Sequence, residues 1–130
     1  MAKRGLIRFL LWPSVALVVV TLSFTAGRLT GSFRPLPTIA ATLTGTETGF
    51  SSEIDERIRK LFPVGSEEAR LIDYLAAEGF APEWQRTGDA KAARFIRQGL
   101  LCDKSVRVVW RCDDKGTLAD VGGSYASHCF

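Results

Sequence analysis

The sequence predicts an α+β domain that follows an N-terminal transmembrane helix. Three observations support this. Residues 9–27 carry no charge, two segments between residues 51 and 80 repeat their apolar residues at helical spacing, and residues 104–125 alternate apolar and polar residues around a turn. Outside the apolar run, the 130-residue chain holds enough apolar residues for only one core. The expected organisation is an anchor at 1–27, a linker at 28–49 and a folded domain at 50–130.

The N-terminal segment has the features of a signal-anchor. Lys3, Arg4 and Arg8 precede the 19 residues Phe9–Gly27, which as a helix would extend roughly 28 Å, close to the hydrocarbon thickness of a bilayer. Leading basic residues favour a cytoplasmic N-terminus and an exported domain. We therefore expect a single-pass protein of the bacterial inner membrane with its domain in the periplasm. Cleavage of a signal peptide near Gly27, which would release a periplasmic or secreted protein, is the alternative.

The charge distribution argues against a nucleic-acid partner. The first 46 residues hold five basic residues and no acidic one, whereas the rest of the chain holds 12 basic and 14 acidic residues. A nucleic-acid binder needs its basic excess on the folded surface that meets phosphates. We expect contact with the membrane through the N-terminal helix and no binding of nucleic acid.

The segment 28–49 is predicted to be a linker. It contains Gly, Ser and Thr, two prolines separated by one residue, and no sustained apolar period. A flexible coil of this length reaches on the order of 25 Å. A short strand at Thr38–Thr44 is the alternative.

The first helix of the domain is expected to run from a cap at Ser51 or Ser52 to about Phe62. Its acidic residues lie in the first turns and its basic residues in the last, which complements the helix dipole. Pro63 follows and stops the helix. The apolar stripe of this helix consists of Ile54, Ile58, Leu61 and Phe62.

A second helix is expected to begin at a Ser66 cap. Its apolar stripe consists of Leu71, Ile72 and Leu75. Gly79 fits the left-handed position just beyond the helix, and Phe80 can fold back onto Leu75, as in a Schellman ending. The following segment, residues 89–98, is ambiguous: its helix formers slightly favour a helix, while Arg94–Arg97 also fits a strand.

The last 30 residues predict a β-hairpin. Val106, Val108 and Trp110 share one face of the first strand, and Val121 and Tyr125 share one face of the second. A two-residue turn at Lys115-Gly116, closed by Asp114 and Thr117, gives paired residue numbers that sum to 231. In this register Trp110 opposes Val121 and Val106 opposes Tyr125.

The same register decides how the three cysteines pair. Export would place them in an oxidising compartment. Cys102 and Cys112 lie ten positions apart on one strand, whereas Cys102 and Cys129 oppose each other directly. We predict a Cys102–Cys129 disulfide and a free thiol at Cys112, opposite Ala119.

The order of helix, helix and antiparallel sheet resembles the BamE (SmpA/OmlA) family of small periplasmic domains, whose layout is shared by β-lactamase inhibitor protein. The similarity rests on Val64–Leu71, which resembles the opening of a family helix, and on Val108–Trp110 with Asp113–Val121, which resemble its final hairpin. The resemblance implies that residues near 92–98 form the first strand of a three-stranded antiparallel sheet. It also implies a role in supporting the assembly of outer-membrane proteins. The first cysteine is Cys102, so the lipid-modified cysteine usual in that family has no counterpart after the apolar run.

The remaining candidates for chemistry have simpler structural explanations. His128, the one histidine, and the three cysteines lack the spacing of a zinc site. Asp113-Asp114 fits a turn, Gly122-Gly123 a β-bulge, and Trp84 core packing. We expect no catalytic, cofactor-binding or metal-ligating residue.

These observations predict a non-enzymatic, membrane-tethered interaction domain of the bacterial envelope that binds another envelope protein. A secreted small inhibitor or ligand-binding protein is the alternative. The expected core consists of Ile54, Ile58, Leu61, Leu71, Ile72, Leu75, Val106, Val108, Trp110 and Val121.

Overall fold

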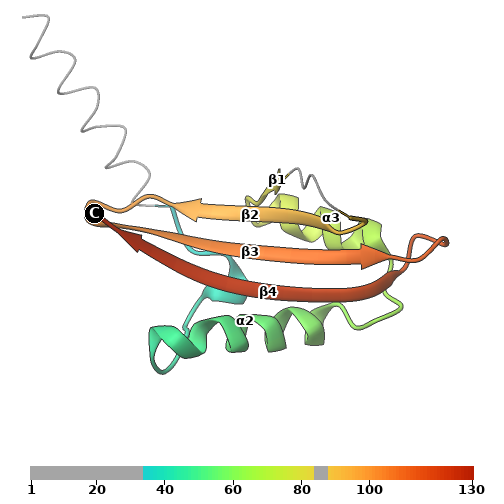
Figure 1. The fold of residues 1–130 in the computed structure, drawn as a ribbon, viewed down its shortest axis with the longest axis horizontal. Coiled ribbons are helices and arrows are strands. Elements are labelled where there is room, and N and C mark those ends of the chain that lie inside the picture. The colour runs from blue at the N-terminus through green and yellow to red at the C-terminus, as the bar shows by residue number, and fades with distance from the viewer. Residues whose placement is uncertain (1–33, 84–87) are drawn as a thin grey trace, which may run out of the picture.

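The computed structural model describes residues 34–83 and 88–130, and the predicted anchor at 1–27 lies outside them (Figure 1). The described part is an α+β domain in which α2 (Glu47–Leu61) and α3 (Glu68–Ala77) pack on one antiparallel sheet. The four strands follow one another in sequence order: β1 (Ala81–Glu83), β2 (Lys91–Arg97), β3 (Cys102–Cys112) and β4 (Leu118–Cys129). The expected three-stranded sheet is thus extended by β1. Within the described residues, no helix has the length and apolarity to cross a membrane.

The chain packs against the domain from well before residue 50. A 3-10 turn, η1 (Thr38–Ala40), buries Ile39 and Ala40 in the core. The Arg57 guanidinium donates hydrogen bonds to the carbonyl oxygens of Ile39 and Ala41, at 3.2 and 2.6 Å. The described part of the predicted linker, residues 34–49, is therefore part of the fold, and it contains no strand at 38–44. A single 3-10 turn leaves no apolar period for sequence analysis to detect.

Helix α2 begins earlier than predicted, because its N-cap lies five or six residues before Ser51 or Ser52. Thr46 is its N-cap residue, so Ser51 and Ser52 lie inside the helix. Ile54 and Ile58 are fully buried, as predicted, whereas Leu61 is 50% exposed at the end of the helix. Phe62, just beyond the helix, is buried.

The end of α3 is a Schellman motif, as predicted. Gly79 has a φ of +86°, the Phe80 amide donates to the Leu75 carbonyl (2.9 Å), and the Gly79 amide donates to the Ala76 carbonyl (3.1 Å). The start differs from the prediction, because the N-cap residue is Glu67 and the Ser66 hydroxyl donates to the Pro63 carbonyl instead. Ile72, predicted to be buried, is 44% exposed.

Residues 91–97 form a strand, as the family resemblance implied for residues near 92–98, although local propensity slightly favoured a helix. Strand β2 pairs with β1 on one side and with β3 on the other. Phe95 and Ala93 alternate into the core, opposite Val106 and Val108. Hydrogen bonding on both edges and burial of one face outweigh the small difference in local propensity.

The predicted hairpin register is confirmed, but its turn is different. Pairs from Cys102–Cys129 to Arg111–Asp120 all have residue numbers that sum to 231. A bulge then shifts the pairing, so that Cys112 opposes Leu118 rather than Ala119. The Asp113 amide donates to the Thr117 carbonyl (2.9 Å), and Gly116 has a φ of +75°. The turn is thus one residue longer than predicted, and the extra residue in β4 restores the register.

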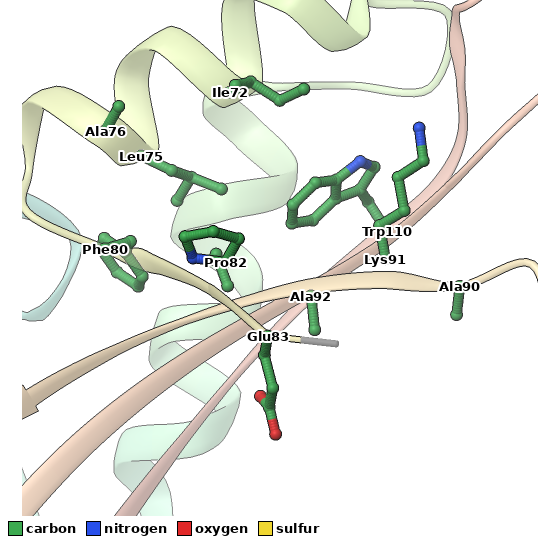
Figure 2. Close-up of a pocket in the computed structure, with 11 residues that line it drawn as sticks. Ile72, Leu75, Ala76, Phe80, Pro82, Glu83, Ala90, Lys91, Ala92 and Trp110 are labelled. Atoms are coloured by element: carbon green, nitrogen blue, oxygen red, sulfur yellow. The ribbon is translucent and has the colours of Figure 1, made fainter. Parts of the chain in front are cut away.

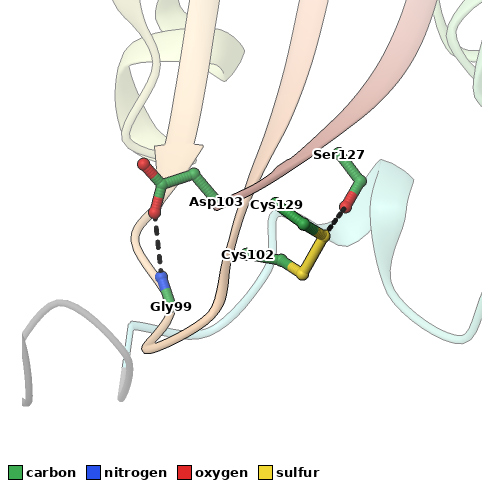
Figure 3. The surroundings of a disulfide bond; sticks show 5 residues. All are labelled: Gly99, Cys102, Asp103, Ser127 and Cys129. Atoms are coloured by element: carbon green, nitrogen blue, oxygen red, sulfur yellow. Dashed lines mark hydrogen bonds between the residues drawn. A yellow bond between two sulfur atoms is a disulfide. The ribbon is translucent and has the colours of Figure 1, made fainter.

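The Cys102–Cys129 disulfide is present, with the two Cα atoms 4.0 Å apart (Figure 3). It joins the first residue of β3 to the last of β4. Cys112 is a free, partly exposed thiol. The bond closes the hairpin at the end opposite its turn.

Helix α2 covers the free edge of β4 with side chains. Asp55 Oδ1 accepts a hydrogen bond from the Gly123 amide (3.0 Å), and Ser51 Oγ bonds both the Tyr125 amide (2.9 Å) and its carbonyl (3.1 Å). Gly122 and Gly123 stay in regular register with β3, so the predicted bulge is not at these glycines. Their role is close approach, because an added Cβ on Gly123 would lie 2.7 Å from Ile54 Cγ2.

Substitution of Gly123 by alanine is expected to lower the free energy of unfolding by about 1–3 kcal/mol, the usual cost of overpacking. The added Cβ would meet the stiff, β-branched side chain of Ile54 and, at 3.4 Å, the Ile54 backbone. Neither group can easily move away. Urea unfolding measures the effect. Gly49→Ala is the matched control, because its added Cβ meets nothing within 4 Å and alanine favours the helix. Equal stability of the two variants would contradict this account of the glycine pair.

Candidate functional site

A partly open cavity of about 460 Å³ lies between α3 and the strands (Figure 2). Figure 2 shows Ile72, Leu75 and Ala76 of α3 on one side and Pro82 and Trp110 on the other. We call this cavity the α3 pocket. Its other lining residues are Phe80, Glu83, Ala90, Lys91, Ala92 and Ala93. The walls are almost entirely apolar, and the volume lies within the usual range of ligand pockets.

The pocket exists because α3 is held at its two ends. At its start, a backbone bridge joins Glu67 to Thr117 and the Glu68 amide donates to the Gly116 carbonyl (3.0 Å). At its end, the Schellman turn leads directly into Phe80 and β1. Between these points α3 approaches the strands less closely than α2 approaches β4. Small side chains at Ala76 and Ala93 leave the space between them unfilled.

Glu68 binds two polar side chains at one end of the pocket. Its Oε1 accepts hydrogen bonds from Lys91 Nζ (2.6 Å) and from Trp110 Nε1 (2.8 Å). The bond from Lys91, followed by that from Trp110, lowers the pKa of the Glu68 carboxyl, although burial opposes the shift. The same hydrogen bond raises the pKa of Lys91. These contacts hold the indole ring of Trp110 in the pocket wall.

Replacement of Glu68 by glutamine is expected to lower the free energy of unfolding by about 1 kcal/mol near neutral pH, because a charged hydrogen bond is lost but solvent screens Lys91. The folded-state pKa of Glu68 lies below its ordinary value of 4.5, so this stabilisation is complete above that pH. It should shrink as the pH falls through the folded pKa. Urea unfolding of both proteins across pH 3–7 measures it, with the exposed neighbour Glu67→Gln as control. A difference that stays constant down to acid pH would contradict the assignment.

Cys112 adjoins this cluster but is poorly suited to nucleophilic chemistry. Burial and a hydrogen bond with Glu68 both raise the pKa of its thiol, and only the charge of Lys91 lowers it. The thiolate, which is the reactive form, is therefore disfavoured near neutral pH.

The sheet face away from the helices carries its own ion pairs. Glu83 Oε1 accepts from Arg94 (2.9 Å) and Glu83 Oε2 from Arg107 (2.8 Å). Figure 2 shows the Glu83 carboxylate pointing away from α3, so it contributes little polarity to the pocket. Alternating apolar and charged faces are usual for an antiparallel sheet with one solvated side.

The other residues considered from the sequence do not converge on this pocket. His128 is exposed near the C-terminus, where it contacts the ring of Phe130, and Cys102 and Cys129 are joined to each other. Asp113 organises the hairpin turn by accepting from the amides of Lys115 (2.9 Å) and Thr117 (3.0 Å). Trp84 lies outside the described residues. In residues 34–83 and 88–130, no group of three or more histidine, cysteine or acidic side chains is placed to hold a metal ion.

Sequence analysis did not find the pocket. Its walls come from α3, β1, β2 and β3, and their separation is a property of the tertiary structure. The one usable signal was the cluster Ala90, Ala92 and Ala93. Three small side chains near a tryptophan-bearing strand indicate either close packing or a hollow.

Comparison with known proteins adds no relative. No family model, no curated protein and no solved structure matches the chain.

Proposed function

We propose that this chain is a membrane-tethered, non-enzymatic interaction domain of the bacterial envelope. In this proposal the α3 pocket receives an apolar side chain of another envelope protein. The observation that carries the proposal is the pocket itself, whose described walls are almost entirely apolar, with Lys91 and Glu83 as their charged members. The Cys102–Cys129 disulfide supports an oxidising, extracytoplasmic location. The basic and apolar N-terminus supports the tether.

The sheet edges favour binding in the pocket over strand addition. Strand β1 is an edge strand of three residues with Pro82 at its centre, and proline cannot donate a hydrogen bond to an incoming strand. The β4 edge is already occupied by Ser51 and Asp55 of α2. Apolar surface that is available to a partner lies instead around Ile72, which is 44% exposed on the pocket rim. Burial of a partner side chain against this rim and the pocket floor would drive association.

A pair of adjacent alanines in α3 tests the proposal. Both Ala76 and Ala77 are exposed, but only Ala76 lines the pocket. Ala76→Phe should fill the pocket and abolish recovery of a partner that is crosslinked to the wild-type chain in intact cells. Ala77→Phe should retain recovery. Recovery that is equal in the two variants, or a failure to crosslink any partner to the wild-type chain, would reject the proposed interaction.

The tether is tested separately. Carbonate washing should leave the chain in the membrane pellet, and protease added to spheroplasts should digest the domain. Protection of the domain would reverse the proposed topology, and release of the chain by carbonate would reject the anchor.

The volume of the α3 pocket supports one alternative, a secreted inhibitor or ligand-binding protein that is released by cleavage near Gly27. A pocket of about 460 Å³ also suits a small apolar molecule. N-terminal sequencing of the mature protein separates the two proposals, because only the released form lacks the apolar segment.

A further inference from the structure

The most exposed large apolar side chains of the described residues lie together at one end of the sheet. Leu100 and Leu101 are 73% and 71% exposed in the loop between β2 and β3, and Phe130 is 78% exposed just beyond β4. The Phe130 amide donates to the Leu101 carbonyl (3.1 Å), so these residues continue the β3–β4 pairing. We call Leu100, Leu101 and Phe130 the sheet tip.

A disulfide and a hydrogen bond hold the sheet tip in place. The Cys102–Cys129 disulfide lies immediately behind it and fixes both of its strands (Figure 3). The Gly99 amide donates to Asp103 Oδ1 (3.2 Å), which ties down the loop that presents the two leucines. Three large apolar side chains held in water by a crosslinked loop form a patch of the kind that marks an interaction surface.

The sheet tip lies at the end of the domain where the described chain begins. In Figures 1 and 3 the segment that starts at Arg34 runs beside the end of β2 and the loop that follows it. The Arg34 guanidinium lies over the ring of Phe95, 5.5 Å from its centroid. Six residues lie between Gly27 and Arg34, and even a fully extended chain over those seven Cα-to-Cα steps spans only about 25 Å. If residues 9–27 cross the membrane, this end of the domain is held close to the lipid surface.

The charges beside the sheet tip fit a lipid surface. Lys104 is exposed and opposes Arg97 in the β2–β3 pairing next to the sheet tip, and basic side chains close to a membrane are attracted to anionic head groups. The nearby carboxylate, Asp103, is directed to the Gly99 amide. Exposed leucine and phenylalanine flanked by basic residues is the composition of a surface that lies in the membrane interface.

We propose that the sheet tip inserts into the surface of the membrane that anchors the chain. The domain is then held by a second contact in addition to its tether, which fixes its orientation and leaves the opposite, hairpin end directed away from the lipid. This inference rests on the proposed tether.

Photolabelling of the full chain tests the inference. The protein is reconstituted in vesicles of phosphatidylethanolamine and phosphatidylglycerol that contain a phospholipid with a diazirine in its acyl chain, irradiated, digested and analysed by mass spectrometry. The peptides with Leu100–Leu101 and Phe130 should carry on the order of tenfold more label than the peptide with Val64, because the reagent resides in the hydrocarbon. Val64 is the matched internal reference, since it is 68% exposed and lies at the hairpin end, where the Gly65 amide bonds the Leu118 carbonyl.

Substitutions complete the test. Leu100→Asp with Leu101→Asp should reduce labelling of the Phe130 peptide to the level of the Val64 peptide, whereas Val64→Asp should leave it unchanged. Labelling of residues 9–27 reports the tether in the same sample. If residues 9–27 are labelled and the sheet tip is not, the inference is overturned while the tether stands. If residues 9–27 are unlabelled, the tether and the inference fail together.

Discussion

Replacement of Leu75 by alanine is expected to lower the free energy of unfolding by about 2–5 kcal/mol. Leu75 is 2% exposed and lies on the buried face of α3, with Phe80 folded back toward it by the Schellman turn. Truncation removes apolar burial and leaves a void that the two helix ends, fixed by their backbone hydrogen bonds, cannot close. A domain of this size has a stability of about 5–15 kcal/mol, so the yield of folded protein should also fall.

Urea unfolding of the two proteins measures the loss. Ile72→Ala in the same helix is the control, because Ile72 is 44% exposed and its truncation should cost far less. Equal losses in the two variants would remove Leu75 from the core.

Removal of the disulfide is expected to lower the free energy of unfolding by about 3 kcal/mol, because the bond restricts the unfolded chain across a separation of 27 residues. Cys102→Ser with Cys129→Ser is the test, and Cys112→Ser is the control. The double variant should unfold at lower urea than the control. It should also raise the flexibility of the sheet tip, which hydrogen exchange of the Gln98–Asp103 amides measures.

Alkylation checks the pairing independently. The unreduced, denatured wild-type protein should be labelled at Cys112 alone. Label on Cys102 or Cys129 in exported material would refute both the bond and the stability argument.

The sequence was sufficient to predict the core-facing residues of the helices and the register of the hairpin. Eight of the ten predicted core residues are buried, and Leu61 and Ile72 are the exceptions. Both lie at the margin of a helical stripe, where helix periodicity predicts the face but not how far the neighbouring element reaches. The register was predictable because each strand has one apolar face, and a slip of one residue would turn the apolar side chains of one strand toward solvent. That register places Cys102 opposite Cys129.

The candidate site could not be predicted in the same way. Lys91 and Trp110 lie 23 and 42 positions after Glu68 in the sequence. The three residues meet only because β2 and β3 pair beneath the start of α3. The proposed membrane-binding tip has the same origin. Leu100, Leu101 and Phe130 belong to a loop and a chain end, which have no periodicity to interpret.

The sequence by itself determined the α+β class, the two helices, the Schellman ending, the hairpin register and the disulfide. Each of these follows from interactions between near neighbours or from the two-residue period of a strand. Only the tertiary structure decided between helix and strand for residues 91–97, which local propensity left ambiguous, and it alone decided that β1 joins the sheet and that Ile39 enters the core. It also decided that Gly123 is a point of contact with Ile54 and that α3 stands off the strands to leave a pocket. The physical reason is that these features depend on the distance between elements, and burial and pairing across that distance outweigh local preferences of a few tenths of a kcal/mol.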